Sequence, residues 1–197
     1  MIFSTKKELK EVINVERRMN GKGLSSALVD SFFQRPVYLI TKYLRHLRYL
    51  EFYQIRGGKI SKLFWLYHYY HKTRLSYKLG YQIPPGTCGK NLILYHYSGG
   101  IVINAQARLG DNCKLYPGLV VGSTPEGVPT IGSNVWIGPG VKIVGKIFIG
   151  DNVIIAPNSV VQKNIPSNVI VGGIPAKVIK EITAENYSKY QDYILPF

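Results

Sequence analysis

Aliphatic residues recur at every sixth position through the second half of the chain. The two series are Ile103, Leu109, Leu115 and Val121, and then Ile131, Ile137, Ile143, Ile149, Ile155 and Val161. An amphipathic helix repeats at about 3.6 residues and an exposed strand at about 2, so neither explains this period. Three hexapeptides, about 18 residues, complete one triangular coil of a parallel β-helix with the aliphatic side chains stacked inside. The pattern therefore predicts a parallel β-helix.

Small and turn-forming residues mark the corners of the predicted coils. Glycine follows the inward aliphatic residue in IGSNVW, IGPGVK and IGDNVI. We expect Gly and Asn or Asp at corners where the backbone takes positive φ. The two series are ten residues apart at Val121 and Ile131, which predicts a four-residue external loop at Thr124-Pro125-Glu126-Gly127.

The first 80 residues are predicted to be mainly helical. Thr5-x-x-Glu8 forms a capping box, so a helix is expected from Lys6 to Met19, ended by Gly21 and Gly23. Further helices are expected over 37–55, after Pro36, and over about 60–79. The predicted fold class is mainly β, with a small helical region at 1–82, a β-helix domain at 83–180 and a C-terminal tail at 181–197.

The hexapeptide repeats, together with GGIPAKVI at 172–179, resemble the hexapeptide-repeat acyltransferase superfamily. The stretch LYHYSGGIVINAQARLG, with the later VGSTPEG and PTIG, is most similar to its serine acetyltransferase branch. The resemblance covers about residues 83–180 and implies a left-handed β-helix, a cyclic homotrimer and an acetyl-CoA-dependent O-acetyltransferase.

The resemblance assigns the role of general base to His96. A neutral imidazole can accept the proton of an attacking hydroxyl near neutral pH, and a thioester donor needs no covalent enzyme intermediate. Backbone N–H groups at glycine corners are expected to stabilise the oxyanion. Glu126, from a neighbouring subunit, is a candidate to orient the ring. His46, His68 and His71 are expected to pack within the helices.

The acetyl-CoA site is expected along successive coils. The resemblance places the donor at small residues and near two cations that suit its phosphates. These positions are Gly122, Ser123, Gly138, Ala156, Lys163 and Lys177. Each glycine is equally explained as a β-helix corner. No metal is expected, because His96 is the single histidine after residue 80 and the zinc-dependent carbonic anhydrase on this scaffold needs three.

The sequence departs from serine acetyltransferases at the residues that would bind the acceptor. These enzymes carry an acidic residue before the base and an Arg-His pair in the following loop, whereas this chain has Tyr95 and STPEGVPTIG. Tyr95, Tyr97 and Asn104 instead suit a saccharide, which favours surface polysaccharide or lipopolysaccharide synthesis. The alternatives are serine O-acetylation in cysteine synthesis, amino-sugar N-acetylation, and a non-catalytic β-helix that recruits a partner.

The chain carries a net charge of +14, and residues 1–80 hold 16 Lys and Arg against 5 Asp and Glu. Interleaved with Tyr and Trp65, these cations either form a solvated face or attract an anionic membrane or a lipid-linked sugar. The residues concerned are Arg45, Arg48, Lys59, Lys62, Lys72 and Arg74. No nucleic-acid motif accompanies them. With no signal peptide and two unpaired cysteines, a cytoplasmic protein is expected, with possible peripheral contact at the membrane.

Overall fold

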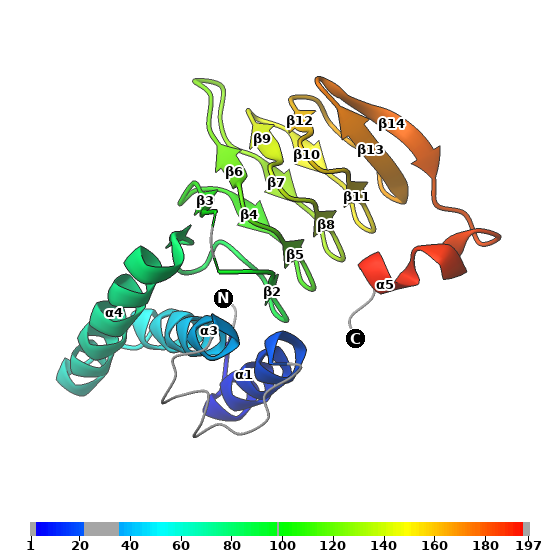
Figure 1. The fold of residues 1–197 in the computed structure, drawn as a ribbon. Helices are drawn as coiled ribbons and strands as arrows, with labels where there is room; N and C mark the ends of the chain where they lie inside the picture. Colours follow the sequence, from blue (N-terminus) through cyan, green and yellow to red (C-terminus); the bar gives the residue numbers. More distant parts are fainter. Residues whose placement is uncertain (1–2, 22–35, 98, 195–197) are drawn as a thin grey trace.

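The computed structural model describes residues 3–21, 36–97 and 99–194. Helices gather at the first coil of a parallel β-helix, and a C-terminal segment runs back along the outside of the coils (Figure 1). The predicted stop at Gly23, Ser98 of the quoted motif and the last three residues of the predicted tail lie outside the described residues. None of the described helices is long and apolar enough to cross a membrane.

The helical region contains α1 (Lys6–Asn20), α3 (Pro36–Gln54) and α4 (Lys59–Leu79). The predicted cap of α1 is confirmed in its first half, because the Thr5 hydroxyl accepts a hydrogen bond from the Glu8 N–H at 3.1 Å. The Glu8 carboxylate, however, accepts from the Ser4 N–H at 2.9 Å rather than from that of Thr5, so the reciprocal bond of a capping box is absent. α4 ends where Gly80 takes the left-handed conformation that a Schellman-type stop requires. The expected helices at 37–55 and 60–79 are therefore present, within one residue at each end.

Within the described residues, fourteen short strands form the three faces of the β-helix. One face holds β1 (Tyr81–Gln82), β3 (Ile101–Ile103), β6 (Leu119–Gly122), β9 (Lys142–Val144) and β12 (Val160–Val161). A second face holds β4 (Arg108–Leu109), β7 (Thr130–Ile131) and β10 (Phe148–Ile149). The third holds β2 (Ile93–Leu94), β5 (Lys114–Leu115), β8 (Trp136–Ile137), β11 (Ile154–Ile155), β13 (Val169–Gly173) and β14 (Ala176–Glu181). We call these faces A, B and C.

Strand pairing confirms the predicted register and its interruption. Thr130 pairs with Phe148, a step of 18 residues, but Arg108 pairs with Thr130, a step of 22. The four extra residues form the predicted external loop, which two backbone hydrogen bonds between Thr124 and Gly127 close at 2.9 and 3.1 Å. The first strand begins at Tyr81, just before the expected domain boundary at residue 83.

The core of the β-helix consists of the predicted six-residue series. Every residue from Ile103 to Val161 in that series is buried, and the same hydrophobic cluster continues into α3 through Tyr43, Leu44 and Leu47. The helices and coils thus share one core. Because burying an aliphatic side chain contributes about 1.5–3 kcal/mol, this shared core is the main stabilising term.

At one corner of successive coils, the residue with positive φ is an asparagine rather than a glycine. Asn91, Asn112, Asn134, Asn152 and Asn168 have φ between 56° and 60°. Each amide Nδ2 in the column donates to the Oδ1 of the next, at 2.8–3.0 Å. The result is a continuous asparagine ladder that satisfies its own side-chain polar groups.

The repeat glycines serve a different purpose from the expected one. Gly110, Gly132 and Gly150 do not have positive φ. A Cβ on Gly132 would instead lie 2.3 Å from Asp151 Oδ1 and 2.8 Å from the Gly150 backbone. The glycines are required because neighbouring coils approach too closely for a side chain.

Both ends of the β-helix are closed by the chain itself. At the first coil, Glu16 accepts from the Leu92 N–H at 3.0 Å, and Asn20 both accepts from the Leu94 N–H and donates to the Leu92 carbonyl. At the last coil, the antiparallel strand β14 covers β13. These contacts satisfy the backbone groups that an open sheet edge would leave unpaired.

Arg48 does not belong to the predicted basic surface, so that part of the expectation is wrong. It is fully buried, and its guanidinium contacts Glu16 at 2.7 Å, Glu51 at 2.8 Å and the carbonyls of Cys88 and Gly89. Burial alone would lower the pKa of Arg48, but the two carboxylates outweigh it and raise the pKa, so the charge is retained. Its role is to join α1, α3 and the first coil.

The C-terminal segment packs on its own protomer. After β14, a short 3₁₀ turn, η1 (Tyr187–Lys189), and α5 (Gln191–Ile194) lie against face C. Ile182 and Ile194 are buried against Ile154, with Trp136 and Ile170 beside them. The outer surface of face C is therefore occupied by the protein's own chain.

Candidate active site

His96 lies at the corner between faces C and A, in the first coil. Its side chain is exposed, and its backbone is left-handed, with φ of 58°. The Tyr81 hydroxyl donates to the His96 carbonyl, and the Tyr81 ring packs edge-on against Tyr43 of α3, with 5.5 Å between centroids. A buried tyrosine pair therefore anchors a strained corner that presents the imidazole to solvent.

Strand register determines which residues share this corner, which we call the His96 corner. Leu94, Leu115, Ile137, Ile155 and Val171 pair in sequence across face C. The residues that follow them therefore form a column along the β-helix: Tyr95, Tyr116, Gly138, Ala156 and Gly172. Three coil steps, about 14 Å at the usual strand spacing, separate Tyr95 from Ala156.

A second group of expected site residues lies at the corner between faces A and B, which we call the Ser123 corner. Ile103, Val121, Ile143 and Val161 pair across face A. Gly122 ends β6, and Asn104, Ser123 and Lys163 follow the strands of this face. Asn104 Nδ2 donates to Ser123 Oγ at 3.3 Å, so the structure brings these two residues together.

The two corners flank face A, so the expected acceptor residues are divided between them. Tyr95 and Tyr97 lie beside His96, whereas Asn104 lies beyond the far end of β3. The Asn104 side chain is also used locally, because its Oδ1 accepts from the Gln106 N–H at 2.9 Å. Within one protomer, Asn104 does not join the His96 corner.

An aromatic stack extends from the His96 corner over face C. The rings of Tyr95 and Tyr116 stack with 4.2 Å between centroids, and Tyr116 lies 6.0 Å from the His96 ring and 5.0 Å from Trp136. Burial raises the pKa of Tyr95 to about 12, so its phenol stays neutral. Tyr116 was not among the site residues predicted from the sequence, although it lies one coil after Tyr95 in the repeat. One face of Tyr95 is thus covered, while Tyr97 is exposed.

The expected acetyl-CoA positions differ in what surrounds them. Gly138 is buried, and a Cβ there would lie 2.9 Å from the Ile155 carbonyl oxygen and from the Trp136 ring, so packing alone accounts for this glycine. Ala156 is half-buried at the same corner. Lys177 is exposed on β14 and pairs with Gly172, which places a cation at the far end of the His96 corner. The exposed Lys163 belongs to the Ser123 corner.

No side chain of the described residues hydrogen-bonds to the His96 ring. Glu126, which we considered for this role, lies in the external loop beyond the Ser123 corner, where hydrogen bonding within that loop lowers its pKa. The described residues also hold no group of three His, Cys, Asp or Glu side chains arranged to bind a metal.

The other histidines form a packed cluster between α3 and α4. His46 Nδ1 and His68 Nδ1 are 2.9 Å apart, and the His46 ring stacks on His71. Burial and the neighbouring positive groups lower the pKa of His46 to about 3, and burial with Arg45 and His71 lowers that of His68 to about 4. Both rings are therefore neutral at pH 7, as packing residues should be.

This cluster makes stability depend on pH. The unfolded chain binds protons at these histidines below about pH 6.5, whereas the folded chain resists protonation until about pH 4. Their contribution is therefore complete above pH 6.5 and is lost as the pH falls toward 4. We expect urea denaturation at pH 5 to show a loss on the order of 2 kcal/mol. In His68→Phe the loss should be smaller, and an unchanged pH dependence would contradict this reading.

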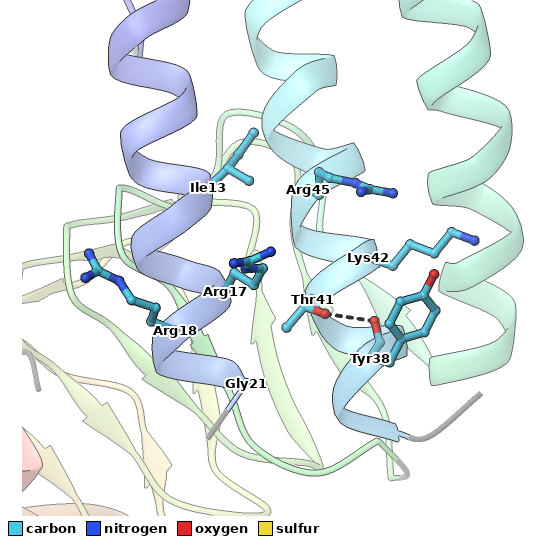
Figure 2. A pocket seen from close by; sticks show the side chains of 8 residues that line it. All are labelled: Ile13, Arg17, Arg18, Gly21, Tyr38, Thr41, Lys42 and Arg45. Carbon is cyan, nitrogen blue, oxygen red and sulfur yellow. Dashed lines mark hydrogen bonds between the residues drawn. The ribbon is translucent and has the colours of Figure 1, made fainter. Parts of the chain in front are cut away.

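A cavity of about 510 Å³ lies between α1 and α3 and is lined by Arg17, Arg18, Lys42 and Arg45, among others. Figure 2 shows that these four side chains do not converge: Arg18 points away from α3, and Lys42 and Arg45 extend toward α4. A single anion cannot contact all four. The cavity is therefore no candidate for the chemistry at His96.

Comparison with known proteins identifies the repeat. A family model described as "Bacterial transferase hexapeptide (six repeats)" matches residues 129–163. Serine acetyltransferase from Synechococcus elongatus is 40% identical over 114 residues, 55% of this chain and 46% of the relative. Serine acetyltransferase from Buchnera aphidicola subsp. Schizaphis graminum is 30% identical over 164 residues, 78% of this chain and 63% of the relative. The chain thus spans between about half and two thirds of these two relatives.

A solved structure covers more of the fold. The crystal structure of serine acetyltransferase from Brucella abortus strain S19 in complex with coenzyme A matches with a TM-score of 0.67 and 27% identity. The match covers 90% of this chain and 70% of that one, helices included. The predicted fold class, a left-handed parallel β-helix preceded by helices, is confirmed.

Proposed function

Because the chain belongs to the hexapeptide-repeat acyltransferase superfamily and resembles its serine acetyltransferase branch, we propose that it is an acetyl-CoA-dependent O-acetyltransferase. The observation that carries the proposal is His96, an exposed imidazole on a strained and anchored corner of the first coil. Positive φ at a non-glycine residue costs about 1–3 kcal/mol, a cost that is typical of functional positions.

His96 would act as general base. The acceptor hydroxyl gives its proton to the imidazole as its oxygen bonds to the acetyl carbon. The C–S bond then breaks, and the proton leaves with the CoA thiol. A positioned base of this kind accelerates a reaction by about 10²–10⁴. Tyr81 would hold the ring in place through its hydrogen bond to the His96 carbonyl.

The donor would lie along the His96 corner. Its thiol end belongs near His96, and Lys177 at the far end of the column offers a charge for its phosphates. Ala156 lies between them and leaves room for the pantetheine arm. Gly138 also leaves room for the donor, but the close packing around it already requires a glycine at this position. Lys163, Gly122 and Ser123 would contact the donor from a neighbouring protomer rather than from the same one.

A cyclic homotrimer would join the two corners. Face C is covered by the C-terminal segment, which leaves faces A and B for contacts between copies. Val102 and Phe148 on these faces are apolar and exposed. We propose that the His96 corner of one protomer faces the Ser123 corner of the next, so that Asn104 and the Thr124–Gly127 loop complete the site.

L-serine is the first candidate acceptor, because the curated relatives are serine acetyltransferases. The comparisons favour it over the saccharide that our sequence analysis preferred, and they give no support to a role in polysaccharide synthesis. A saccharide is the second candidate, on one specific observation. Tyr95 precedes His96 and the loop lacks an Arg-His pair, so neither of these two positions offers a charged partner for the ends of a free amino acid.

To identify the acceptor, the release of the CoA thiol from acetyl-CoA is measured with the full chain, in the presence of L-serine or of saccharides. We expect release with L-serine at ordinary enzymatic rates, on the order of 1–10³ s⁻¹. Release with mono- or oligosaccharides and not with serine would make the second candidate correct. No release with either, while calorimetry still detects CoA binding, would contradict both acceptors.

We also propose that the protein contacts an anionic membrane peripherally. The sequence suggested this from its basic and aromatic N-terminal region. The surface concerned is the exposed side of α4, which carries Leu63, Leu66, Tyr70 and Tyr77.

A further inference from the structure

α4 buries one side and leaves the other uncovered. His68, Leu75 and Leu79 pack toward α3 and the first coil. Residues at helical spacing on the opposite side are large, apolar and exposed, including Leu63 at 67%, Leu66 at 57% and Tyr77 at 86%. With Tyr70 they form a stripe that we call the outer face of α4. Ile60, Tyr67 and Tyr69 flank it and are also exposed.

This exposure is concentrated in one element. Of the sixteen large apolar or tyrosine side chains that are exposed among the described residues, eight lie on α4. Scattered apolar residues are normal on a protein surface, but a contiguous patch indicates a binding surface. Figure 1 places α4 at the outside of the helical group, away from the coils of the β-helix.

The charges around the outer face of α4 are of one sign. α4 contains five Lys or Arg residues and no Asp or Glu. The one acidic residue of the neighbouring α3 is Glu51, and it is paired with Arg48. A partner for this surface must therefore be apolar at its centre and negative around it.

Cation-lined hollows lie beside both ends of α4. One of about 550 Å³ at its N-terminal end is lined by Arg56, Lys59, Lys62 and Trp65, among others. Another of about 640 Å³ lies between α3 and the C-terminal part of α4, lined by Lys42, His71, Arg74 and Lys78, among others. Lys42 extends toward α4, as Figure 2 shows. Phosphate groups would fit these hollows while the stripe between them remains apolar.

We propose that the outer face of α4 binds the surface of a bilayer that contains anionic phospholipid. The helix would lie in the plane of the interface, with leucines toward the acyl chains, tyrosines at headgroup level and lysines on phosphates. A second copy of the chain is disfavoured, because pairing two such faces would set like charges against each other. The inference does not depend on the proposed acetyl transfer.

The test is co-sedimentation of the full chain with phosphatidylcholine vesicles, with and without phosphatidylglycerol. We expect binding to the vesicles that contain phosphatidylglycerol, and we expect added salt to weaken it. Leu63→Glu combined with Leu66→Glu should reduce the apparent affinity by about tenfold or more. Lys59→Glu with Lys62→Glu should weaken the binding as well. Because all four side chains are exposed, these variants should fold normally.

Ile179→Glu is the matched control, since Ile179 is equally exposed, at 65%, but lies on β14. It should bind vesicles like the parent chain. Equal loss in this control, equal binding to phosphatidylcholine alone, or no vesicle binding at all would overturn the proposal. So would a change in oligomeric state on light scattering in the Leu63→Glu, Leu66→Glu variant without vesicle binding, because that result would make the face a contact between copies.

Discussion

Replacing Arg48 with methionine should lower the free energy of unfolding by about 3–5 kcal/mol. The substitution removes the one cation between Glu16 and Glu51, and it leaves two buried carboxylates without compensation. It also removes the donors to the carbonyls of Cys88 and Gly89 in the first coil. Urea denaturation followed by circular dichroism measures the loss.

Arg45→Met is the matched control, because Arg45 is exposed on the same helix and the change should stay within about 0.5 kcal/mol. Adding Glu16→Gln and Glu51→Gln to Arg48→Met should restore part of the stability, since the uncompensated charges are then gone. If Arg48→Met unfolds no more easily than Arg45→Met, the buried network does not hold the helices to the β-helix.

Replacing His96 with asparagine should lower kcat/KM by a factor of about 10²–10⁴ and leave the fold and the oligomeric state intact. Asparagine suits the test because it adopts left-handed backbone more readily than alanine, so the corner is kept while the imidazole is lost. Steady-state thiol release with the acceptor that proves active is the measurement.

Tyr69→Phe serves as the control for His96→Asn, because Tyr69 is exposed on α4 and belongs to neither the His96 corner nor the Ser123 corner. Its turnover should remain within a few-fold of the parent chain. Turnover in His96→Asn that matches the parent would remove His96 from the reaction. CoA binding by calorimetry then shows whether the donor site itself is intact.

The repeat could be read from the sequence because inward side chains must recur once per strand of the triangular coil. The four-residue loop followed from the same count, as the step from Arg108 to Thr130 confirms. The reason for the repeat glycines was misassigned. Coil-to-coil approach is a three-dimensional property, and a sequence shows only that the residue is small, whether at Gly132 or at a true positive-φ turn such as Gly140.

The burial of the Arg48 charge could not be predicted from the sequence either. Arg48 sits among other cations in α3 and resembles them, and only the packing of α1 against α3 brings Glu16 to it. Similarly, His96 is marked by resemblance, but its neighbours depend on register. Asn104 is close to His96 in the sequence, but β3 lies between them and sets them at opposite edges of face A. Lys163 follows β12 and lies at the same far edge as Asn104.

The closed ends of the β-helix bear on how the protein avoids polymerising. Each coil offers the next a full set of strand edges, and an uncovered first or last coil would accept a coil from another molecule just as well. Glu16, Asn20 and Arg48 occupy backbone groups of the first coil, and β14 covers the face C edge of the last coil. Stacking of a second molecule on either end is thereby hindered, and copies can associate through the sides of the prism.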